Sequence, residues 1–272
     1  MKVTDLCQLV GMTRQNYYKM RSIRKKQSID EDLMLQFVRR ERAVQPQLGG
    51  RKLLHLLRPE LHEAGVSIGR DRFFEFMGSK GLLIARRRRQ VKTTDSRHGF
   101  VVYENLLKDM KLTDANQAFV SDITYIRTEE GFLYLALMMD AFSRMVVGYD
   151  CSDSLEAEGA LRALSQTLRQ LPAGSIAVHH SDRGLQYCCH RYVEMLKSRG
   201  LRVSMTQENH CYENGRAERL NGILKQEYGL GETFLTKADA MRAVRQAVEL
   251  YNCCRPHQAL GYRTPMSVHI AA

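Results

Sequence analysis

The first part of the chain has apolar residues at helical spacing, interrupted by short glycine turns. Within residues 3–21, a segment with Leu6 and Leu9 on its apolar side precedes Gly11, and Thr13 can cap a second short helix that ends within this stretch. Two helices joined by a glycine turn form the helix-turn-helix pattern, which many other helical hairpins share. The pattern therefore predicts two adjacent helices and leaves DNA binding open.

A second helical unit over residues 49–83 repeats this plan. An apolar helix containing Pro59 is followed by a turn at 65–69 and by another helix that opens with Arg70 and Arg72. Proline inside a helix removes a backbone hydrogen bond, so the first helix of this unit is expected to be kinked or split. The two arginines at the start of the second helix are candidates for contacts with DNA.

From residue 118 the pattern changes to alternating and continuous apolar runs, which are typical of strands. The expected strands cover residues 118–127, 132–139, 144–151, 176–180 and 201–205. The expected helices cover residues 155–171 and 190–198, and a further helix carries Glu218. Three antiparallel strands followed by alternating helices and strands predict an α/β fold, with a mixed five-stranded sheet and flanking helices.

Composition identifies an ordinary folded protein. The chain has 272 residues, of which 44% are hydrophobic and 26% charged. Its longest apolar run, 132–139, is far too short to cross a membrane, and the N-terminus lacks a signal-peptide pattern. The seven cysteines include two adjacent pairs, unlike a secreted disulfide framework. We therefore expect reduced thiols and a cytoplasmic location.

The net charge of +11 is concentrated in the first 100 residues. They carry 22 Lys and Arg against 10 Asp and Glu, whereas residues 101–272 carry 19 against 20. Lysine and arginine placed against phosphates release condensed counterions, which gives affinity for any DNA sequence. The basic part is thus predicted to bind DNA, with a merely solvated surface as the alternative.

Four consecutive arginines stand in a segment with few apolar residues, which predicts an extended basic linker along a phosphate backbone. They are Arg86, Arg87, Arg88 and Arg89. Changing all four to glutamine should weaken binding to any duplex and lower the slope of log affinity against log salt by up to about four units, at roughly 0.9 per phosphate contact. Binding titrations over a range of salt concentrations measure this slope. An unchanged slope would identify the run as a spacer.

Three acids in separate segments are the candidate catalytic residues. Asp122 stands inside an apolar strand, where a carboxylate is costly without a neutralising partner. Asp182 follows a strand's carboxyl end, where α/β sheets bind ligands, and Glu218 lies in the first turn of its helix. Oxygen ligands of this kind suit two Mg²⁺ or Mn²⁺ ions, which would leave a site attractive to a phosphodiester.

Three further charged residues stand near these acids in sequence. Arg216 and Arg219 flank Glu218 and are candidates for holding a DNA strand. Asp140, in a hairpin turn, is either a fourth acid near the metals or a side chain that satisfies local amides.

Four segments of the chain resemble the transposases of the IS-three insertion sequences. These are "VSDITYI", "HSDRGLQY", "ENGRAERLNGILKQE" and "YNCCRPHQALGYRTP". Between Asp182 and Glu218 lie 35 residues, the interval typical of the Asp, Asp, Glu transposases and retroviral integrases. The resemblance covers nearly the whole chain and implies a ribonuclease-H-like integrase catalytic core, preceded by a helical helix-turn-helix-type DNA-binding region.

The resemblance also implies roles for individual residues. Asp122, Asp182 and Glu218 would be the catalytic metal ligands, and Lys225 would contact the transposon end. Lys225 is two helical turns after Glu218, so both project from one face of the helix. The expected domains are a DNA-binding region over 1–84, a basic linker over 85–112 and a catalytic core over 113–272, which ends in a strap from about residue 232.

The function expected from this resemblance is DNA transposition: metal-dependent cleavage of one strand at the insertion-sequence end, then transfer of the freed 3′-hydroxyl to target DNA. Two alternatives stay open, a nuclease of the same fold that cuts without joining, and a DNA-binding regulator with an inactive core. Two DNA ends must meet, so a homo-oligomer is expected. A product of an upstream reading frame is a further expected partner, by fusion.

Overall fold

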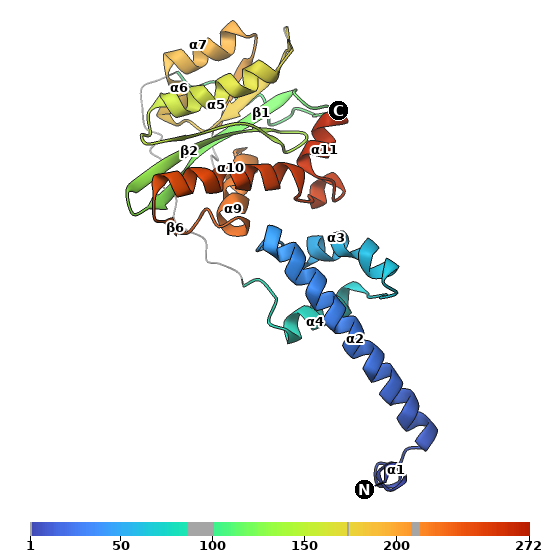
Figure 1. Ribbon diagram of the computed structural model, residues 1–272. Coiled ribbons are helices and arrows are strands. Elements are labelled where there is room, and N and C mark those ends of the chain that lie inside the picture. Colours follow the sequence, from blue (N-terminus) through green and yellow to red (C-terminus); the bar gives the residue numbers. More distant parts are fainter. Residues whose placement is uncertain (1, 86–100, 173, 208–212) are drawn as a thin grey trace. The chain divides into compact units, whose positions relative to one another are not determined.

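The computed structural model describes residues 2–85, 101–172, 174–207 and 213–272 (Figure 1). The chain forms two compact units, Met1–Arg86 and Arg87–Ala272, which are described separately. The arginine run 86–89 predicted to follow DNA lies outside the described residues. No helix of the described part is long and apolar enough to span a membrane.

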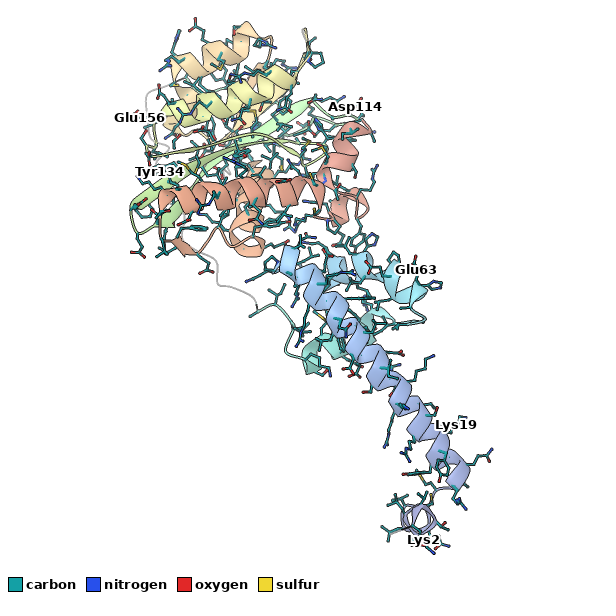
Figure 2. The ribbon with its side chains drawn as sticks, in the orientation of Figure 1. Lys2, Lys19, Glu63, Asp114, Tyr134 and Glu156 are labelled. Atoms are coloured by element: carbon teal, nitrogen blue, oxygen red, sulfur yellow. The ribbon has the colours of Figure 1, made fainter. Side chains whose placement is uncertain are left out.

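The described part of the first unit contains four helices, and the last three of them enclose a small apolar core. The four helices are α1 (Val3–Leu9), α2 (Arg14–Val44), α3 (Gly50–Glu63) and α4 (Arg70–Ser79). Leucines of α3 and phenylalanines of α4 pack on the second half of α2, where Val38 is fully buried. The side chains around Lys19, in the first half of α2, extend into solvent on all sides (Figure 2).

Two details of this unit differ from the sequence-based expectation. Thr13 caps α2 as predicted, accepting a hydrogen bond from the Asn16 amide at 3.1 Å. However, the predicted short second helix is wrong, because α2 continues to Val44 through a stretch without glycine or proline. Pro59 does not split its helix, since α3 runs through it to Glu63.

The second unit is built on a mixed sheet. Its main strands are β1 (Ala118–Thr128), β2 (Gly131–Asp140), β3 (Val146–Ser152), β4 (Val178–Ser181) and β5 (Arg202–Met205), in the order β3-β2-β1-β4-β5. The first three strands pair antiparallel, whereas β4 lies parallel to β1 and β5 parallel to β4. The predicted five strands are therefore present. A sixth strand of two residues, β6 (Thr233–Phe234), was not predicted and pairs with the end of β1.

Helices cover both faces of this sheet (Figure 1). On one face lie α5 (Ala157–Gln170), α6 (Leu185–Cys188) and α7 (His190–Ser198), and on the other α9 (Gly215–Glu227) and α10 (Lys237–Cys253). The chain ends with η1 (Gln258–Leu260) and α11 (Pro265–Ile270). Alternate residues of β1 enter the two cores: Val120 faces the α9 and α10 side, and Phe119 faces α5 and α7.

The linker was expected to cover residues 85–112, but the last residues of this range belong to the second unit. There, Leu106, Leu107 and Met110 contact the core beneath α9 and α10. The Leu106 amide also donates a hydrogen bond to Ser204 Oγ at 2.9 Å. These apolar side chains explain why the segment lies on the protein surface instead of forming a solvated tether.

Gly148 on β3 allows helix α5 to lie close against the sheet. A Cβ atom at this position would be 2.2 Å from the Ala163 carbonyl oxygen and 2.5 Å from Thr167 Oγ1. Gly148→Ala should therefore destabilise the protein by about 1–3 kcal/mol, as overpacking typically does. Urea unfolding measures this change. Gly222→Ala is the control, since nothing lies within 4 Å of its Cβ position and the helix should gain slightly in stability.

Candidate active site

Strand pairing brings two of the three predicted acids to the same level of the sheet. β1 and β4 are parallel neighbours, with Val120 paired to His180. Continuing this register by two residues places Asp122 beside Asp182, which directly follows the last residue of β4. The middle of β1 and the carboxyl end of β4 therefore hold the two carboxylates side by side, although the residues are far apart in sequence.

Asp122 is a strongly perturbed carboxyl group. It is partly buried and accepts hydrogen bonds from Asn221 Nδ2 at 2.7 Å and from the Ile123 amide at 3.0 Å. Burial, followed by the negative charge of Asp182, raises its pKa to about 7 despite these two donors, and Glu218 adds a smaller effect. Asp122 is therefore close enough to both other predicted acids for their charges to raise its pKa, and the charge of Asp182 has the larger effect.

A short, tightly fixed loop holds Asp182. Its Oδ1 atom accepts a hydrogen bond from the Gly184 amide at 2.9 Å, and a Cβ atom on residue 184 would approach that oxygen to 3.0 Å. Next to it, Arg183 Nε donates to the Thr206 carbonyl at 2.7 Å, and its Nη2 donates to the Gln207 carbonyl. This role of Arg183 was not predicted from the sequence.

Helix α9 supplies the third acid and two further residues. Glu218 lies in its first turn and is partly exposed. Asn221, one turn later, holds Asp122, although the sequence reading did not single it out. Lys225 follows after another turn, with its Nζ atom 4.2 Å from the centre of the Tyr125 ring. Burial, together with the nearby charge of Arg127, lowers the pKa of Lys225.

The donor set fits a divalent metal chemically, although it is not assembled around one. Among the residues that the structure describes, no three His, Cys, Asp or Glu side chains gather closely enough to hold a metal ion as they stand. The negative charge of Asp182, however, makes it harder for the neighbouring Asp122 carboxyl group to ionise. A cation bound between the two carboxylates would remove this repulsion. The fit therefore rests on the Asp122 and Asp182 pair, with Glu218 approaching from α9.

The other predicted charged residues do not join these acids. Counting 100° per residue, Arg216 and Arg219 lie roughly 100–160° around α9 from Glu218, so they face away from the acid side. In the first unit, Arg70 and Arg72 are exposed at the start of α4, and Arg70 pairs with Asp71 at 2.7 Å.

Asp140 satisfies the amides of a turn, which was the second of the two roles considered for it. Its carboxylate accepts hydrogen bonds from the amides of Asn116, Phe142 and Ser143 at 2.7–3.1 Å. It is completely buried by these contacts. Asp140 therefore fixes the β2–β3 turn and is not a fourth ligand.

Two comparisons by sequence define the class of the second unit. The family described as "Integrase core domain" matches residues 113–211, and a second family with the same description matches residues 199–265. Among solved structures, the integrase catalytic core domain of HTLV-2 in complex with magnesium is 19% identical with a TM-score of 0.46, over 57% of this chain and 97% of that one. The matched families identify this unit as an integrase catalytic core.

Curated relatives identify the family. The "Insertion element IS600 uncharacterized 31 kDa protein" of Shigella sonnei is 34% identical over 96% of each chain. The transposase for insertion sequence element IS629, also of Shigella sonnei, is 32% identical over 76% of this chain and 69% of its own length. Transposase InsF for insertion sequence IS3A of Escherichia coli (strain K12) is 38% identical over 62% of this chain and 59% of its own length. The chain belongs to the IS3 family of insertion-sequence transposases, which confirms the resemblance found in the sequence.

Proposed function

We propose that Asp122, Asp182 and Glu218 are the catalytic residues and hold two Mg²⁺ or Mn²⁺ ions during strand cleavage and strand transfer. The observation that carries this proposal is the placement of Asp122 and Asp182 at one level of neighbouring parallel strands, with the helix of Glu218 held against Asp122 through Asn221. Integrase-type enzymes as a class use divalent metal ions, which supports the choice of cofactor.

The three carboxylates supply the oxygen ligands for these ions. When bound, the metals activate the attacking oxygen and stabilise the leaving oxygen of the phosphodiester. Asp122 lies nearest to Asp182 and is held by Asn221, so its carboxylate keeps one orientation while DNA enters and leaves. Glu218 is partly exposed, and its longer side chain allows it to complete the set from α9.

The remaining residues of the site position the chemistry and the DNA. Arg183 and Gly184 fix the loop of Asp182, so that this carboxylate stays beside Asp122. Lys225 lies on the same helix as Glu218 and above the Tyr125 ring, where a cation can contact a phosphate next to the cleaved bond. Exposed Arg70 and Arg72 of the first unit are the proposed contacts with the terminal repeat, and target DNA is the second nucleic-acid partner.

Strand transfer joins two ends of one element, so we propose that more than one copy of the chain acts in a synaptic complex. Integrase-type proteins as a class bind DNA and form oligomers, which supports this proposal. A fusion with the product of an upstream reading frame is the other partner that we propose.

A labelled terminal duplex incubated with the protein and Mn²⁺ tests the function. A transposase releases the 3′-hydroxyl at the element end and then yields a joined product with a second duplex. A nuclease of the same fold would release the cut strand without joining it, and an inactive regulator would bind the duplex equally with Mn²⁺ or EDTA. Joined product that requires the metal supports the proposal, and either of the other two results contradicts it.

A further inference from the structure

Helix α9 separates the acids from a second polar site. Its acid side carries Glu218 and Asn221, and Asn221 contacts β1 through Asp122. Its other side carries Arg216, Arg219 and Ile223, which line a pocket. One helix therefore presents Glu218, Asn221 and Lys225 on one side and Arg216 and Arg219 on another.

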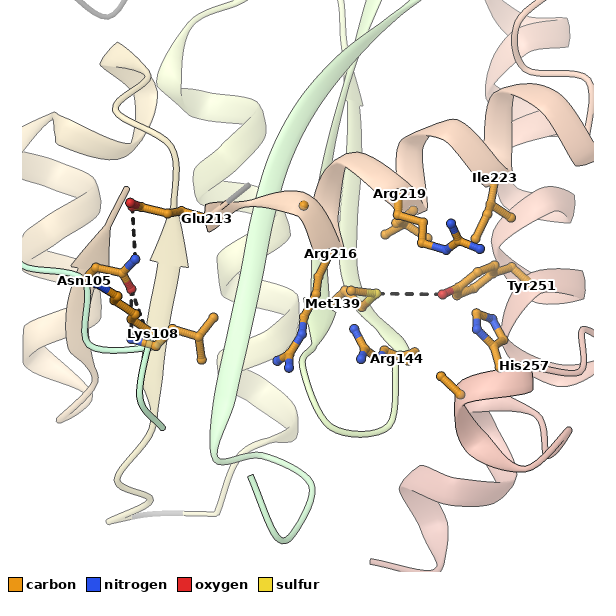
Figure 3. A pocket seen from close by; sticks show the side chains of 14 residues that line it. Asn105, Lys108, Met139, Arg144, Glu213, Arg216, Arg219, Ile223, Tyr251 and His257 are labelled. Carbon is orange, nitrogen blue, oxygen red and sulfur yellow. Dashed lines mark hydrogen bonds between the residues drawn. The ribbon is translucent and has the colours of Figure 1, made fainter. Parts of the chain in front are cut away.

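This pocket has a volume of about 550 Å³, which is in the range of pockets that hold small ligands. Besides the residues of α9, its wall includes Met139 at the end of β2, Arg144 in the β2–β3 turn, Tyr251 of α10 and His257 after it. In Figure 3 the guanidinium groups of Arg144 and Arg216 lie on one side of Met139, and that of Arg219 lies on the other side, near Tyr251. Three positively charged side chains from two separate segments thus line one cavity.

The three arginines lack carboxylate partners among the residues that the structure describes. Arg216 makes one long contact, from Nη1 to the Ala141 carbonyl at 3.5 Å. Burial and the positive charges of Arg216 and Arg219 lower the pKa of Arg144, while Asp140 and Tyr251 offset part of this effect. The carboxylate of Asp140 already accepts hydrogen bonds from the backbone amides of Asn116 and Ser143. Lys108 and the carboxylate of Glu213 also line the pocket, so arginine and lysine outnumber acidic side chains in its wall.

A neighbouring arginine shows how this chain neutralises a buried guanidinium. Arg255, whose side chain is 3% exposed, forms two hydrogen bonds of 2.8 Å with the Glu227 carboxylate. A bidentate pair of this type is the usual solution for a structural arginine. The arginines of the pocket have no such partner in the described part of the chain: Arg144 is partly buried, and Arg216 and Arg219 are exposed, so a bound anion could reach all three.

The backbone of Arg144 gives an independent indication of function. Its φ angle is +66°, in the left-handed region that glycine or asparagine adopts with little strain. An arginine at such a position is held there at a cost in free energy, and strained residues of this kind concentrate at ligand sites. The strained turn carries the guanidinium of Arg144 to the pocket.

We propose that Arg144, Arg216 and Arg219 form a phosphate-binding site on the side of α9 opposite the acids, and that it takes a phosphate group from DNA or from solution. Guanidinium groups bind phosphate oxygens through two parallel hydrogen bonds, and three of them around one cavity suit a tetrahedral dianion or a phosphodiester. This proposal depends on the proposed function only if the phosphate comes from DNA. A phosphodiester held there would be a second contact of the chain with DNA, separate from the cleaved bond.

Thermal melting of the full chain with EDTA and increasing sodium phosphate, at constant ionic strength, tests this site. Phosphate should raise the melting temperature of the wild type, because a ligand that binds only the folded state stabilises it. Arg144→Gln and Arg219→Gln should each weaken the affinity for phosphate about tenfold or more, as expected when charge-assisted hydrogen bonds are lost. Arg245→Gln, at an exposed position of α10, is the matched control and should respond as the wild type does.

A second arm identifies the source of the phosphate. Titrations with duplex DNA at several salt concentrations should show a slope reduced by about 0.9 in Arg144→Gln if the pocket holds a backbone phosphate. An unchanged slope together with a lost phosphate response assigns the pocket to the free ion. The proposal is wrong if both variants match the wild type in phosphate response and in salt slope. Neither arm requires metal or cleavage, so failure here differs from failure of the proposed transposition activity.

Discussion

Replacing Asp182 with asparagine should lower the rate of strand cleavage by roughly a thousandfold or more, because bound metal ions supply several kcal/mol of transition-state stabilisation. The same loss is expected for Asp122→Asn and Glu218→Gln. Affinity for duplex DNA should stay within a few-fold of the wild type, since the excess positive charge lies in residues 1–100. Single-turnover cleavage of a labelled terminal duplex, together with a binding titration, measures both quantities.

The matched control for this experiment is Asp153→Asn. Asp153 is exposed and pairs with Lys237 at 2.7 Å, away from the proposed ligands. This variant should cleave at the wild-type rate. If one of the three acids tolerates its amide without loss of rate, that residue is not a metal ligand. Equal loss of DNA binding and cleavage would instead point to a folding defect.

Asp122→Asn should stabilise the metal-free protein at neutral and higher pH. The gain in the free energy of unfolding should reach up to roughly 4 kcal/mol, because a shift of one pKa unit corresponds to about 1.4 kcal/mol. Burial and the neighbouring carboxylates raise the pKa of Asp122 from 3.8 to about 7. A raised carboxyl pKa means that the wild type loses stability as the pH rises from about 4 to about 7. The variant lacks this ionisation, so its advantage should grow between pH 5 and pH 8. Urea unfolding in EDTA at these two pH values measures the difference.

The structure indicates that asparagine fits at this position. Asn221 donates to Asp122 through Nδ2, while its Oδ1 atom is buried without a hydrogen-bond partner among the described residues. Turning the Asn221 amide over would present that oxygen to the new amide group. Added Mn²⁺ should stabilise the wild type and have less effect on the variant. A variant that is less stable in EDTA and still gains fully from Mn²⁺ would show that Asp122 has a structural role only.

Much of the fold could be predicted from the sequence because the core of the second unit is periodic. The alternation in β1 and the helix of His190–Ser198 follow directly from the spacing of apolar residues. β6 could not be predicted in this way, since two residues are too few to show a period. The length of α2 was missed because its first half is exposed and polar, so only the absence of glycine and proline indicates that the helix continues.

The candidate site was predictable only in part, for a different reason. Asp122 could be picked out because a carboxylate inside an apolar strand is unusual, and Asp182 and Glu218 because the interval between them resembles that of the transposases. Asn221 carries no charge, so its contact with Asp122 appears only when α9 is packed against β1. Likewise, Arg216 and Arg219 flank Glu218 in sequence, yet the helical rotation of about 100° per residue turns them away from it.

The proposed ligands are spread over β1, the loop after β4 and helix α9, so a newly made chain completes the set only late in its synthesis. β1 leaves the ribosome before its parallel neighbour β4, and α9, with Glu218, follows later still. Until α10 is also made, Leu133 and Leu135 on the same side of the sheet lack their cover. Pairing of strands distant in sequence is slow, and partly built sheets are prone to aggregation. If the three acids act as proposed, a copy that ends before α9 lacks one ligand and should not cut DNA, so only completed molecules would expose the genome of the cell to cleavage.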